Sequence, residues 1–265
     1  EVKDEYRDNG TFLYFDEKEE IQCYESDAQP LHSKLPLLVF RPHTSSDLAH
    51  FVLSCCIREI AVTARCGGSG LSGSSVPSKE GVVVLTGHLS QIKKYDPFKG
   101  IVVVEPGVTP RQLNAYVRKD GWHFPLSMAS EGVAGLAGCL SMNARGYHQQ
   151  QDDIYQSVRG VKLIDGEGKI REVPSSFVCG AEGLLGIIIE MEIQLSKIPE
   201  NRWNGSFEGS WSELFEKFPH LDALQTLTRC IRWRNRFYFK IEGDGWRVRS
   251  AVDHLKKELG NVIEE

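Results

Sequence analysis

The chain alternates between short apolar runs and amphipathic stretches. Four apolar runs have the length of buried strands, at residues 37–40, 60–64, 82–86 and 101–104. Apolar residues at 48, 51, 52 and 55 share one face of a predicted helix that Thr44, Ser45 or Ser46 can cap. A second predicted helix begins at Thr109-Pro110-Arg111-Gln112, a capping box with Pro at the first helical position, and ends at Gly121. Strands and helices therefore follow one another through the first half of the chain.

The second half continues with strands and then changes in composition. Residues 158–164 and 169–173 predict a hairpin around Asp165-Gly166-Glu167-Gly168. Apolar and polar residues alternate from Ile187 to Leu195, which predicts a strand with one buried face. Four of the five Trp lie between residues 203 and 246, so we expect a domain boundary just after Pro199. The rest predicts strand, helix, two strands and a final helix that ends at Gly260.

A loop rich in small residues, Arg65 to Pro77, lies between two of the predicted strands. Its glycines at 67, 68, 70 and 73 favour positive φ and a close approach of backbone N–H groups to an anion. The loop could be a flexible linker, a nicotinamide-type G-x-G-x-x-G fingerprint or a strand-loop-strand cradle for a pyrophosphate. The fingerprint requires a helix directly after the glycines, and Pro77 and the lack of a helical period argue against one. The cradle needs no such helix.

Composition and charge exclude several classes of function. The 265 residues carry 31 basic and 36 acidic side chains, a net charge of −5, and no long basic cluster, so we expect no nucleic-acid partner. No apolar stretch reaches the ~18 residues of a membrane span. Seven cysteines without a C-x-x-C pair indicate neither a disulfide framework nor a zinc site. With no secretory signal pattern at the start of the sequence, we expect a reducing, cytoplasmic location.

Several motifs in a fixed order carry a family resemblance. They are Tyr24-Glu25-Ser26-Asp27, the Arg65 to Pro77 loop, Pro106-Gly107-Val108, Gly135-Leu136-Ala137-Gly138, Asn143-Ala144-Arg145-Gly146 and Gly180 to Ile188. In these motifs the sequence resembles the FAD-binding half of the glycolate oxidase and D-lactate dehydrogenase branch of the vanillyl-alcohol oxidase (PCMH-type) flavoproteins. The resemblance covers about two thirds of the chain.

The resemblance implies an α+β fold. It implies a PCMH-type FAD-binding domain of two α+β subdomains at residues 37–198, after an N-terminal segment at 1–36, and a partial α+β cap, or substrate, domain at 199–265. Relatives with covalent flavin carry a His in the glycine loop, and this loop has none, so the resemblance implies non-covalent FAD. The family's paired glycines before the flavin are Ala137-Gly138 here, and its Tyr-Gly after the Asn motif is Gln151-Asp152.

The resemblance also implies which residues contact FAD. The loop would surround the pyrophosphate, with the residues Arg65, Cys66, Gly67, Gly68, Ser69, Gly70, Leu71 and Ser72. The ribityl chain and flavin ring would lie along a second group, made of Ala129, Ser130, Gly135, Ala137, Gly138 and Asn143. Gly183, Ile187 and Ile188 would line the adenine end.

The substrate side of the site is less complete in the sequence. His123, His148, His220 and His254 are candidates for acid or base chemistry, but none has a supporting partner nearby in sequence, and we assign neither a catalytic residue nor a metal site. Two functions remain open. The first is an FAD-dependent oxidoreductase that takes a hydride from the carbinol carbon of a small substrate, a 2-hydroxy acid by the resemblance. The second is a non-catalytic FAD-binding subunit or truncated fragment in a larger flavoprotein complex, with a partner electron-transfer subunit.

Overall fold

The computed structural model describes most of the chain, in ranges separated by short gaps: residues 13–15, 17–29, 31–77, 80–147, 154–219, 221, 224 and 226–265. Contacts between Cα atoms divide the chain into two compact units. Unit 1 consists of residues 1–124, 129–144 and 154–196, and unit 2 consists of residues 125–128, 145–153 and 197–265. Each unit has a buried apolar core of its own.

The first sheet of unit 1 has the strand order β1-β2-β4-β3. The strands are β1 (Leu13–Phe15), β2 (Leu38–Arg41), β3 (Ala61–Arg65) and β4 (Gly81–Leu85). β4 pairs in parallel with β2 and β3, and β1 pairs antiparallel with β2. The strand β1 lies in the segment 1–36, so residues 13–15 of that segment join the sheet.

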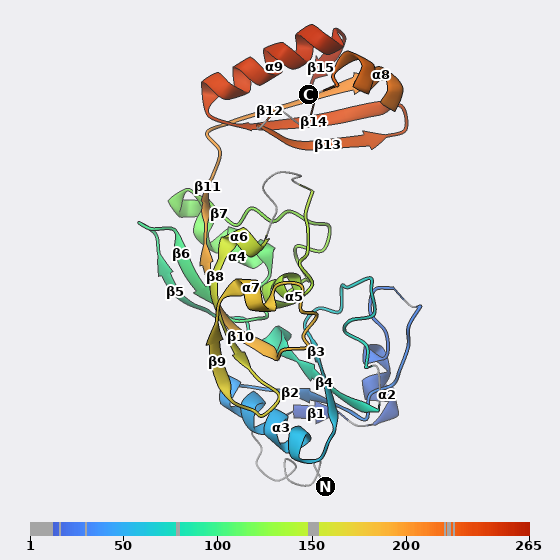
Figure 1. Cartoon of the computed structure of the whole chain (residues 1–265), viewed down its shortest axis with the longest axis vertical. Coiled ribbons are helices and arrows are strands. Elements are labelled where there is room, and N and C mark those ends of the chain that lie inside the picture. Colours follow the sequence, from blue (N-terminus) through green and yellow to red (C-terminus); the bar gives the residue numbers. More distant parts are fainter. Residues whose placement is uncertain are drawn as a thin grey trace. The chain divides into compact units, whose positions relative to one another are not determined.

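Helix α3 (Ser45–Ile57) connects β2 to β3 and packs on this sheet, as the blue elements of Figure 1 show. It begins with a capping box between Thr44 and Asp47, and Leu48, Phe51, Val52 and Cys55 are buried. The ring of Phe51 stacks on that of Phe40 in β2, with centroids 3.9 Å apart. The predicted helix and its apolar face are confirmed.

The second sheet of unit 1 is antiparallel, with the order β5-β6-β10-β8-β9. The strands are β5 (Ile92–Asp96), β6 (Ile101–Val104), β8 (Val158–Ile164), β9 (Ile170–Val173) and β10 (Ile187–Gln194). The predicted hairpin is β8 and β9, and β10 is the predicted one-sided strand. A register shift between Ile188 and Glu190 buries both Ile188 and Ile189, which simple alternation did not predict.

Short elements complete unit 1. They are α2 (Lys18–Ile21), η1 (Gln22–Tyr24), η2 (Thr86–His88), α4 (Pro110–Val117), η3 (Arg118–Asp120), β7 (Trp122–His123), α5 (Leu136–Ser141), α6 (Ile154–Ser157) and α7 (Ser175–Val178), while β11 (Ser196–Lys197) lies at the unit boundary. The predicted capping box at Thr109 and Gln112 begins α4. The predicted end at Gly121, where φ is +75°, follows a final turn of 3₁₀ helix.

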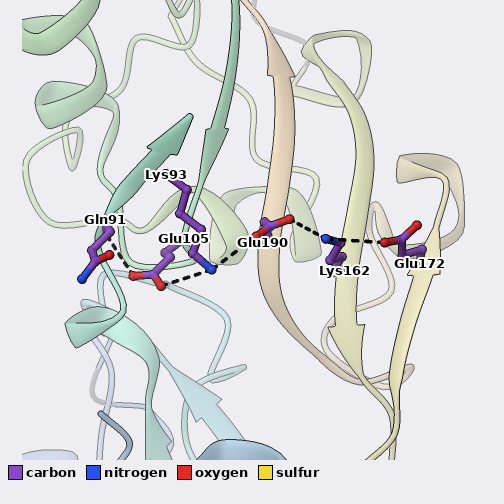
Figure 2. Close-up of polar contacts among 6 residues, drawn as sticks. All are labelled: Gln91, Lys93, Glu105, Lys162, Glu172 and Glu190. Atoms are coloured by element: carbon purple, nitrogen blue, oxygen red, sulfur yellow. Dashed lines mark hydrogen bonds and ion pairs between the residues drawn. The ribbon is translucent and has the colours of Figure 1, made fainter. Parts of the chain in front are cut away.

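A row of alternating charges crosses the second sheet (Figure 2). Glu190 lies at its centre and pairs with Lys162 at 3.0 Å and with Lys93 at 3.3 Å. Lys93 also contacts Glu105 at 3.4 Å, and Lys162 contacts Glu172 at 3.4 Å. Burial alone would raise the pKa of Glu190, but the hydrogen bonds from Lys162 and Lys93 outweigh it and hold the pKa below its ordinary value. The row joins strands β5, β10, β8 and β9, and Glu105 just after β6, through their side chains.

The central position of Glu190 predicts a stability effect that depends on pH. A carboxylate with a lowered pKa in the folded protein stabilises it above the unfolded-state pKa and loses that contribution as the pH falls. We expect Glu190→Gln to lower the free energy of unfolding by about 1 kcal/mol at pH 7 and by less at pH 3. Urea unfolding at both pH values measures this. Glu172→Gln, at the exposed end of the row, is the control, and an equal loss in both variants would contradict the prediction.

Unit 2 is built on a sheet with the order β13-β14-β12-β15, with two helices on one side of it (Figure 1, orange and red). The elements are β12 (Asn201–Glu208), α8 (Trp211–Lys217), β13 (Leu227–Trp233), β14 (Arg236–Gly243), α9 (Gly245–Leu259) and β15 (Val262–Glu264). Its core joins Phe207, Phe237 and Phe239 of the strands to Leu214 of α8 and Leu255 of α9. The predicted order of strand, helix, two strands and helix is confirmed, and β15 is an additional strand.

Two findings bear on the expectations from composition. No helix in the described ranges is long and apolar enough to cross a membrane. All seven cysteines lie within these ranges and carry free thiols, with Cys23 and Cys56 exposed and Cys55 and Cys139 buried.

Candidate functional site

The glycine loop connects β3 to β4, two neighbouring strands that run parallel. Parallel strands need a crossover connection, and this connection contains no helix in its described residues, 66–77 and 80. The nicotinamide-type fingerprint places the first turn of a helix at this point, so the structure disfavours it. The loop is a strand-loop-strand connection, as one of the three interpretations of the sequence requires.

Two charged side chains hold the base of the loop. Asp27 accepts a hydrogen bond from the backbone N–H of Gly73 at 2.8 Å and another from the N–H of Gln29 at 2.9 Å. The guanidinium of Arg65 donates to the carbonyl oxygen of Ser26 at 2.7 Å and lies over the ring of Tyr24. The Arg65 side chain therefore anchors the loop to the preceding segment, and burial lowers its pKa.

The middle of the loop presents a row of free donors. From Gly68 to Ser72, no backbone N–H donates to a group within the described part of the chain. The hydroxyl of Ser75 is buried and has no hydrogen-bond partner among the described residues. Backbone donors are nearly always satisfied in folded proteins, by the chain itself, by water or by a ligand. Five consecutive N–H groups therefore form a donor set that suits an anion.

The glycines of the loop serve different purposes. Gly68 and Gly73 have positive φ, +60° and +78°. Gly67 and Gly70 do not, so the prediction that all four glycines favour positive φ is wrong for these two. At Gly67 the reason is space, because a Cβ there would lie 2.1 Å from the carbonyl oxygen of Val133. At Gly70 a Cβ would meet only ordinary contacts, the nearest with Asp27 at 3.5 Å.

The loop packs against the segment that leads into α5. Besides the contact of Gly67 with Val133, a Cβ at Gly135 would lie 2.3 Å from the sulfur of Cys66. Burial raises the pKa of the Cys66 thiol, although N–H groups of Gly135 and Gly67 face its sulfur, and burial raises the pKa of the nearby Cys139 to about 12. The structure thus brings the first predicted group, residues 65–72, beside the start of the second.

Helix α5 carries one exposed position among buried ones. Gly138 is exposed, whereas Leu136, Ala137, Cys139 and Leu140 around it are buried. A Cβ at Gly138 would meet no atom of the described residues within 4 Å. The helix therefore exposes its backbone at Gly138, with no described atom within 4 Å of an added Cβ.

The other predicted residues frame the two ends of α5. Ala129 and Ser130 lie in the turn before it, where the carbonyl oxygen of Ser130 accepts hydrogen bonds from the N–H groups of Val133 and Ala134. Asn143 follows α5 with a φ of +46° and contacts the segment around Gly180. All residues of the second predicted group thus lie within a single continuous segment, residues 129–143.

Gly183, Ile187 and Ile188 form a third group in the turn before β10 and at its start. Gly183 is exposed and has a φ of +81°, and a Cβ at this position would meet no described atom within 4 Å. Ile188 is only 4% exposed and Ile187 is partly buried against the core of the first sheet. The adjacent Glu182 donates from its N–H to the carbonyl oxygen of Ser141 at 2.9 Å, which joins this turn to the end of α5.

A known protein family matches the region that contains the glycine loop and α5. The model of this family, described as "FAD binding domain", matches residues 36–174, more than half of the chain. The chain belongs to this FAD-binding domain family. FAD is therefore its cofactor, and the donor set of the loop fits the pyrophosphate that FAD carries.

Two curated relatives are similar to more than half of this chain. The chain is 24% identical over 264 residues to the mitochondrial D-2-hydroxyglutarate dehydrogenase of Rattus norvegicus, covering 86% of this chain and 48% of that protein. It is 24% identical over 193 residues to the glycolate oxidase subunit GlcD of Bacillus subtilis, covering 68% of this chain and 41% of the relative. The chain thus spans about half the length of the curated relatives it matches.

Solved structures share the fold at lower identity. An alkyldihydroxyacetonephosphate synthase matches with a TM-score of 0.84 at 14% identity, over 99% of this chain and 59% of the other. A p-cresol methylhydroxylase with bound substrate matches with a TM-score of 0.74 at 17% identity, over 95% of this chain and 62% of the other. The predicted PCMH-type α+β fold is confirmed.

The candidate histidines do not gain a role from the structure. His123 lies in β7, and His254 of α9 packs edge-on against the ring of Phe218 at 5.0 Å. His148, His220 and the pair Gln151-Asp152 lie outside the described residues. Within the ranges that the structure describes, no group of three or more His, Cys, Asp or Glu side chains could hold a metal ion.

Sequence reasoning missed the hydrogen bond of Asp27 to the loop and the burial of the Ser75 hydroxyl. Asp27 was part of a family motif without an assigned role, and its bond to Gly73 spans 46 residues. Ser75 is one of several serines in the loop, and only its burial without a partner among the described residues distinguishes it. No local signal in the sequence could have separated either residue from its neighbours.

Proposed function

We propose that the protein is an FAD-dependent oxidoreductase that acts on a CH–OH group, with a 2-hydroxy acid of the glycolate or D-lactate type as substrate. One observation carries the cofactor side of the proposal, which is the row of free N–H groups from Gly68 to Ser72 packed against the segment before α5. The substrate class comes from the names of the relatives, D-2-hydroxyglutarate dehydrogenase and glycolate oxidase subunit.

In this proposal each predicted group holds one part of FAD. The backbone from Arg65 to Ser72 donates hydrogen bonds to the pyrophosphate, with the Ser69 and Ser72 hydroxyls as further donors. The segment from Ala129 to Asn143 lies along the ribityl chain and the ring, where Gly138 leaves room for the ring to approach the backbone. Gly183, Ile187 and Ile188 line the adenine end.

When bound, FAD supplies a two-electron acceptor for the hydride that leaves the carbinol carbon. In this proposal the protein holds the cofactor and the substrate at the distance and orientation that hydride transfer needs. We assign cofactor binding to a domain at residues 37–198. We assign residues 199–265 to a partial cap domain. We further propose a cytoplasmic location, because free thiols are typical of a reducing compartment. We also propose a partner electron-transfer subunit.

The binding mode of FAD can be tested directly. The glycine loop contains no His, and we therefore expect FAD to be held without a covalent bond. Precipitation of the purified protein with acid should release all flavin absorbance into the supernatant. Flavin that remains with the precipitate would contradict non-covalent binding.

The proposed activity is tested by anaerobic reduction of the bound flavin. The FAD-loaded protein is mixed with glycolate, with each enantiomer of lactate and with each enantiomer of 2-hydroxyglutarate, and dithionite serves as the control for a reducible flavin. Rapid bleaching by one of these acids supports the dehydrogenase. Bleaching by dithionite alone would contradict it and would favour the alternative, a non-catalytic FAD-binding subunit or fragment of a larger flavoprotein complex.

A further inference from the structure

The turn between β5 and β6, residues 97–100, exposes an aromatic side chain at the edge of the second sheet (Figure 1). Phe98 is 95% exposed, more than any other large apolar side chain in the described part of the chain. Its ring therefore adds nothing to the core of unit 1 and leaves its apolar area in water. What surrounds the ring decides whether this exposure has a use.

Hydrogen bonds fix the backbone of this turn. The N–H groups of Phe98 and Lys99 donate to the carboxylate of Asp96, at 3.0 Å and 3.1 Å. The indole N–H of Trp122 donates to the carbonyl oxygen of Pro97 at 2.7 Å. The side chain of Phe98 thus stands on an ordered backbone, and little further ordering of the backbone is needed when the ring meets a partner.

The turn between β8 and β9, residues 165–169, has the same backbone support and different side chains. The carboxylate of Asp165 accepts hydrogen bonds from the N–H groups of Glu167 at 3.0 Å and Lys169 at 2.9 Å. The charges of this turn are paired locally, Lys169 with Glu167 at 2.7 Å and Asp165 with Arg171 at 2.8 Å. A turn of this kind therefore needs neither an exposed Phe nor an unpaired cation.

The lysines around Phe98 are unpaired, in contrast to Lys169. Lys94 of β5, Lys99 of the turn and Lys119 of η3 are exposed, and none of them forms an ion pair with a described residue. Three ammonium groups without counter-ions therefore accompany the exposed ring. Such a surface attracts an anionic partner.

A pair of tyrosines joins Lys119 to β5. The ring of Tyr116 in α4 lies 5.7 Å from that of Tyr95 in β5, edge to face. Tyr116 is 45% exposed, and the ammonium of Lys119 lies 5.5 Å from its ring centroid. Two carboxylates are close by, but Asp96 holds the turn and Asp120 lies beside the Tyr95 hydroxyl. The positive charge of the lysines is left available.

Five residues thus form one exposed surface of aromatic rings and lysines. We call it the β5 surface, and its residues are Lys94, Phe98, Lys99, Tyr116 and Lys119. Protein–protein interfaces are depleted in Lys, and their strongest contacts lie in a closely packed centre. An almost fully exposed ring beside lysines matches a lipid surface better. Anionic headgroups attract lysines, and aromatic side chains settle at the boundary between headgroups and acyl chains.

We propose that the β5 surface binds an anionic phospholipid membrane. Phe98 inserts its ring at the headgroup boundary, and the three lysines lie against the lipid phosphates. The binding is peripheral and reversible, because one inserted ring and three lysines provide less apolar burial than a lipid anchor or a spanning helix. The inference goes beyond the proposed function and does not rest on it, because none of these five residues is among the proposed FAD contacts.

Co-sedimentation of the purified protein with phospholipid vesicles tests the proposal. One set of vesicles contains phosphatidylcholine and phosphatidylglycerol in equal amounts, and the other contains phosphatidylcholine alone. Phe98→Ser is compared with Ile57→Ser, because Ile57 of α3 is another exposed apolar side chain of unit 1, at 72%. Lys99→Gln is compared with Lys169→Gln, because both lysines lie in hairpin turns of the same sheet and each change removes one positive charge.

We expect wild type to bind the mixed vesicles and to bind phosphatidylcholine only weakly. Phe98→Ser should weaken binding to the mixed vesicles about fivefold or more, because the ring supplies most of the apolar area. Lys99→Gln should weaken it about threefold to fivefold. Ile57→Ser and Lys169→Gln should stay within about twofold of wild type. Binding should also weaken as salt rises above 0.1 M, where the Debye length is about 10 Å.

A gain of binding provides an independent check. Phe98→Trp should bind the mixed vesicles at least as tightly as wild type, since Trp favours the membrane interface. Circular dichroism and thermal unfolding verify that each variant is folded, which the exposure of all four substituted positions favours.

Three outcomes would overturn the proposal. The first is the absence of binding to the mixed vesicles, which would leave the β5 surface to a protein partner. The second is an equal loss in Phe98→Ser and Ile57→Ser, or in Lys99→Gln and Lys169→Gln. The third is equal binding to both kinds of vesicle at every salt concentration, because the lysines would then have no role.

Discussion

Replacement of Gly138 by alanine is expected to weaken FAD binding at least tenfold while stabilising the FAD-free protein. The two effects have separate causes. Alanine is the better helix former by about 0.5–1 kcal/mol, and its Cβ meets no described atom within 4 Å, so the apo protein gains stability. With FAD bound, the same methyl group would occupy the space that we assign to the flavin ring. A substitution that raises the stability of the FAD-free protein and lowers its affinity for FAD separates the role of Gly138 in folding from its role in cofactor binding.

The measurement combines urea unfolding of the apo protein with titration of FAD. Gly166→Ala is the matched control, since a Cβ at Gly166 is also free of described atoms within 4 Å and this residue lies in the turn between β8 and β9. We expect the control to keep wild-type affinity for FAD. If Gly138→Ala binds FAD as tightly as the control does, the flavin ring does not lie against α5.

The elements of this fold that could be predicted are those with local causes. The sequence predicted the capping box at Thr109 that begins α4, and it gave Thr44, Ser45 or Ser46 as the cap of α3, where the structure has Thr44 in a capping box with Asp47. The strand β6 was predicted from four consecutive apolar residues, 101–104. In contrast, β5 contains Lys93 and Lys94 and was not predicted, because its pairing with β6 at the sheet edge tolerates charges on the exposed face.

The candidate site also combines features with local causes, which could be predicted, and features that depend on distant contacts, which could not. The sequence predicted the loop as a cradle from its glycines, but not that Gly67 serves packing while Gly68 serves backbone conformation. That difference depends on Val133, 66 residues away in sequence. Long-range contacts of this kind leave no trace in a single sequence.

The packing role of Gly67 leads to the second large effect, the loss of both stability and FAD binding in Gly67→Ala. The added Cβ would lie 2.1 Å from the carbonyl oxygen of Val133 and 2.6 Å from its Cγ1. The oxygen belongs to a backbone turn held by hydrogen bonds from Val133 and Ala134 to Ser130, at 2.9 Å and 2.8 Å, so it cannot move alone. Overpacking of this kind costs about 1–3 kcal/mol.

The displaced backbone carries the five free N–H groups from Gly68 to Ser72, so FAD affinity should fall by about a hundredfold or more in Gly67→Ala. Gly70→Ala, in the same loop, is the control for stability, because its Cβ would meet only ordinary contacts at 3.5 Å and 3.6 Å. Its free energy of unfolding should stay within about 0.5 kcal/mol of wild type. Urea unfolding and fluorescence titration with FAD measure the two quantities. Wild-type FAD affinity in Gly67→Ala would show that the pyrophosphate lies elsewhere and would return the loop to the status of a flexible linker, since displacement of a true cradle cannot leave its ligand unaffected.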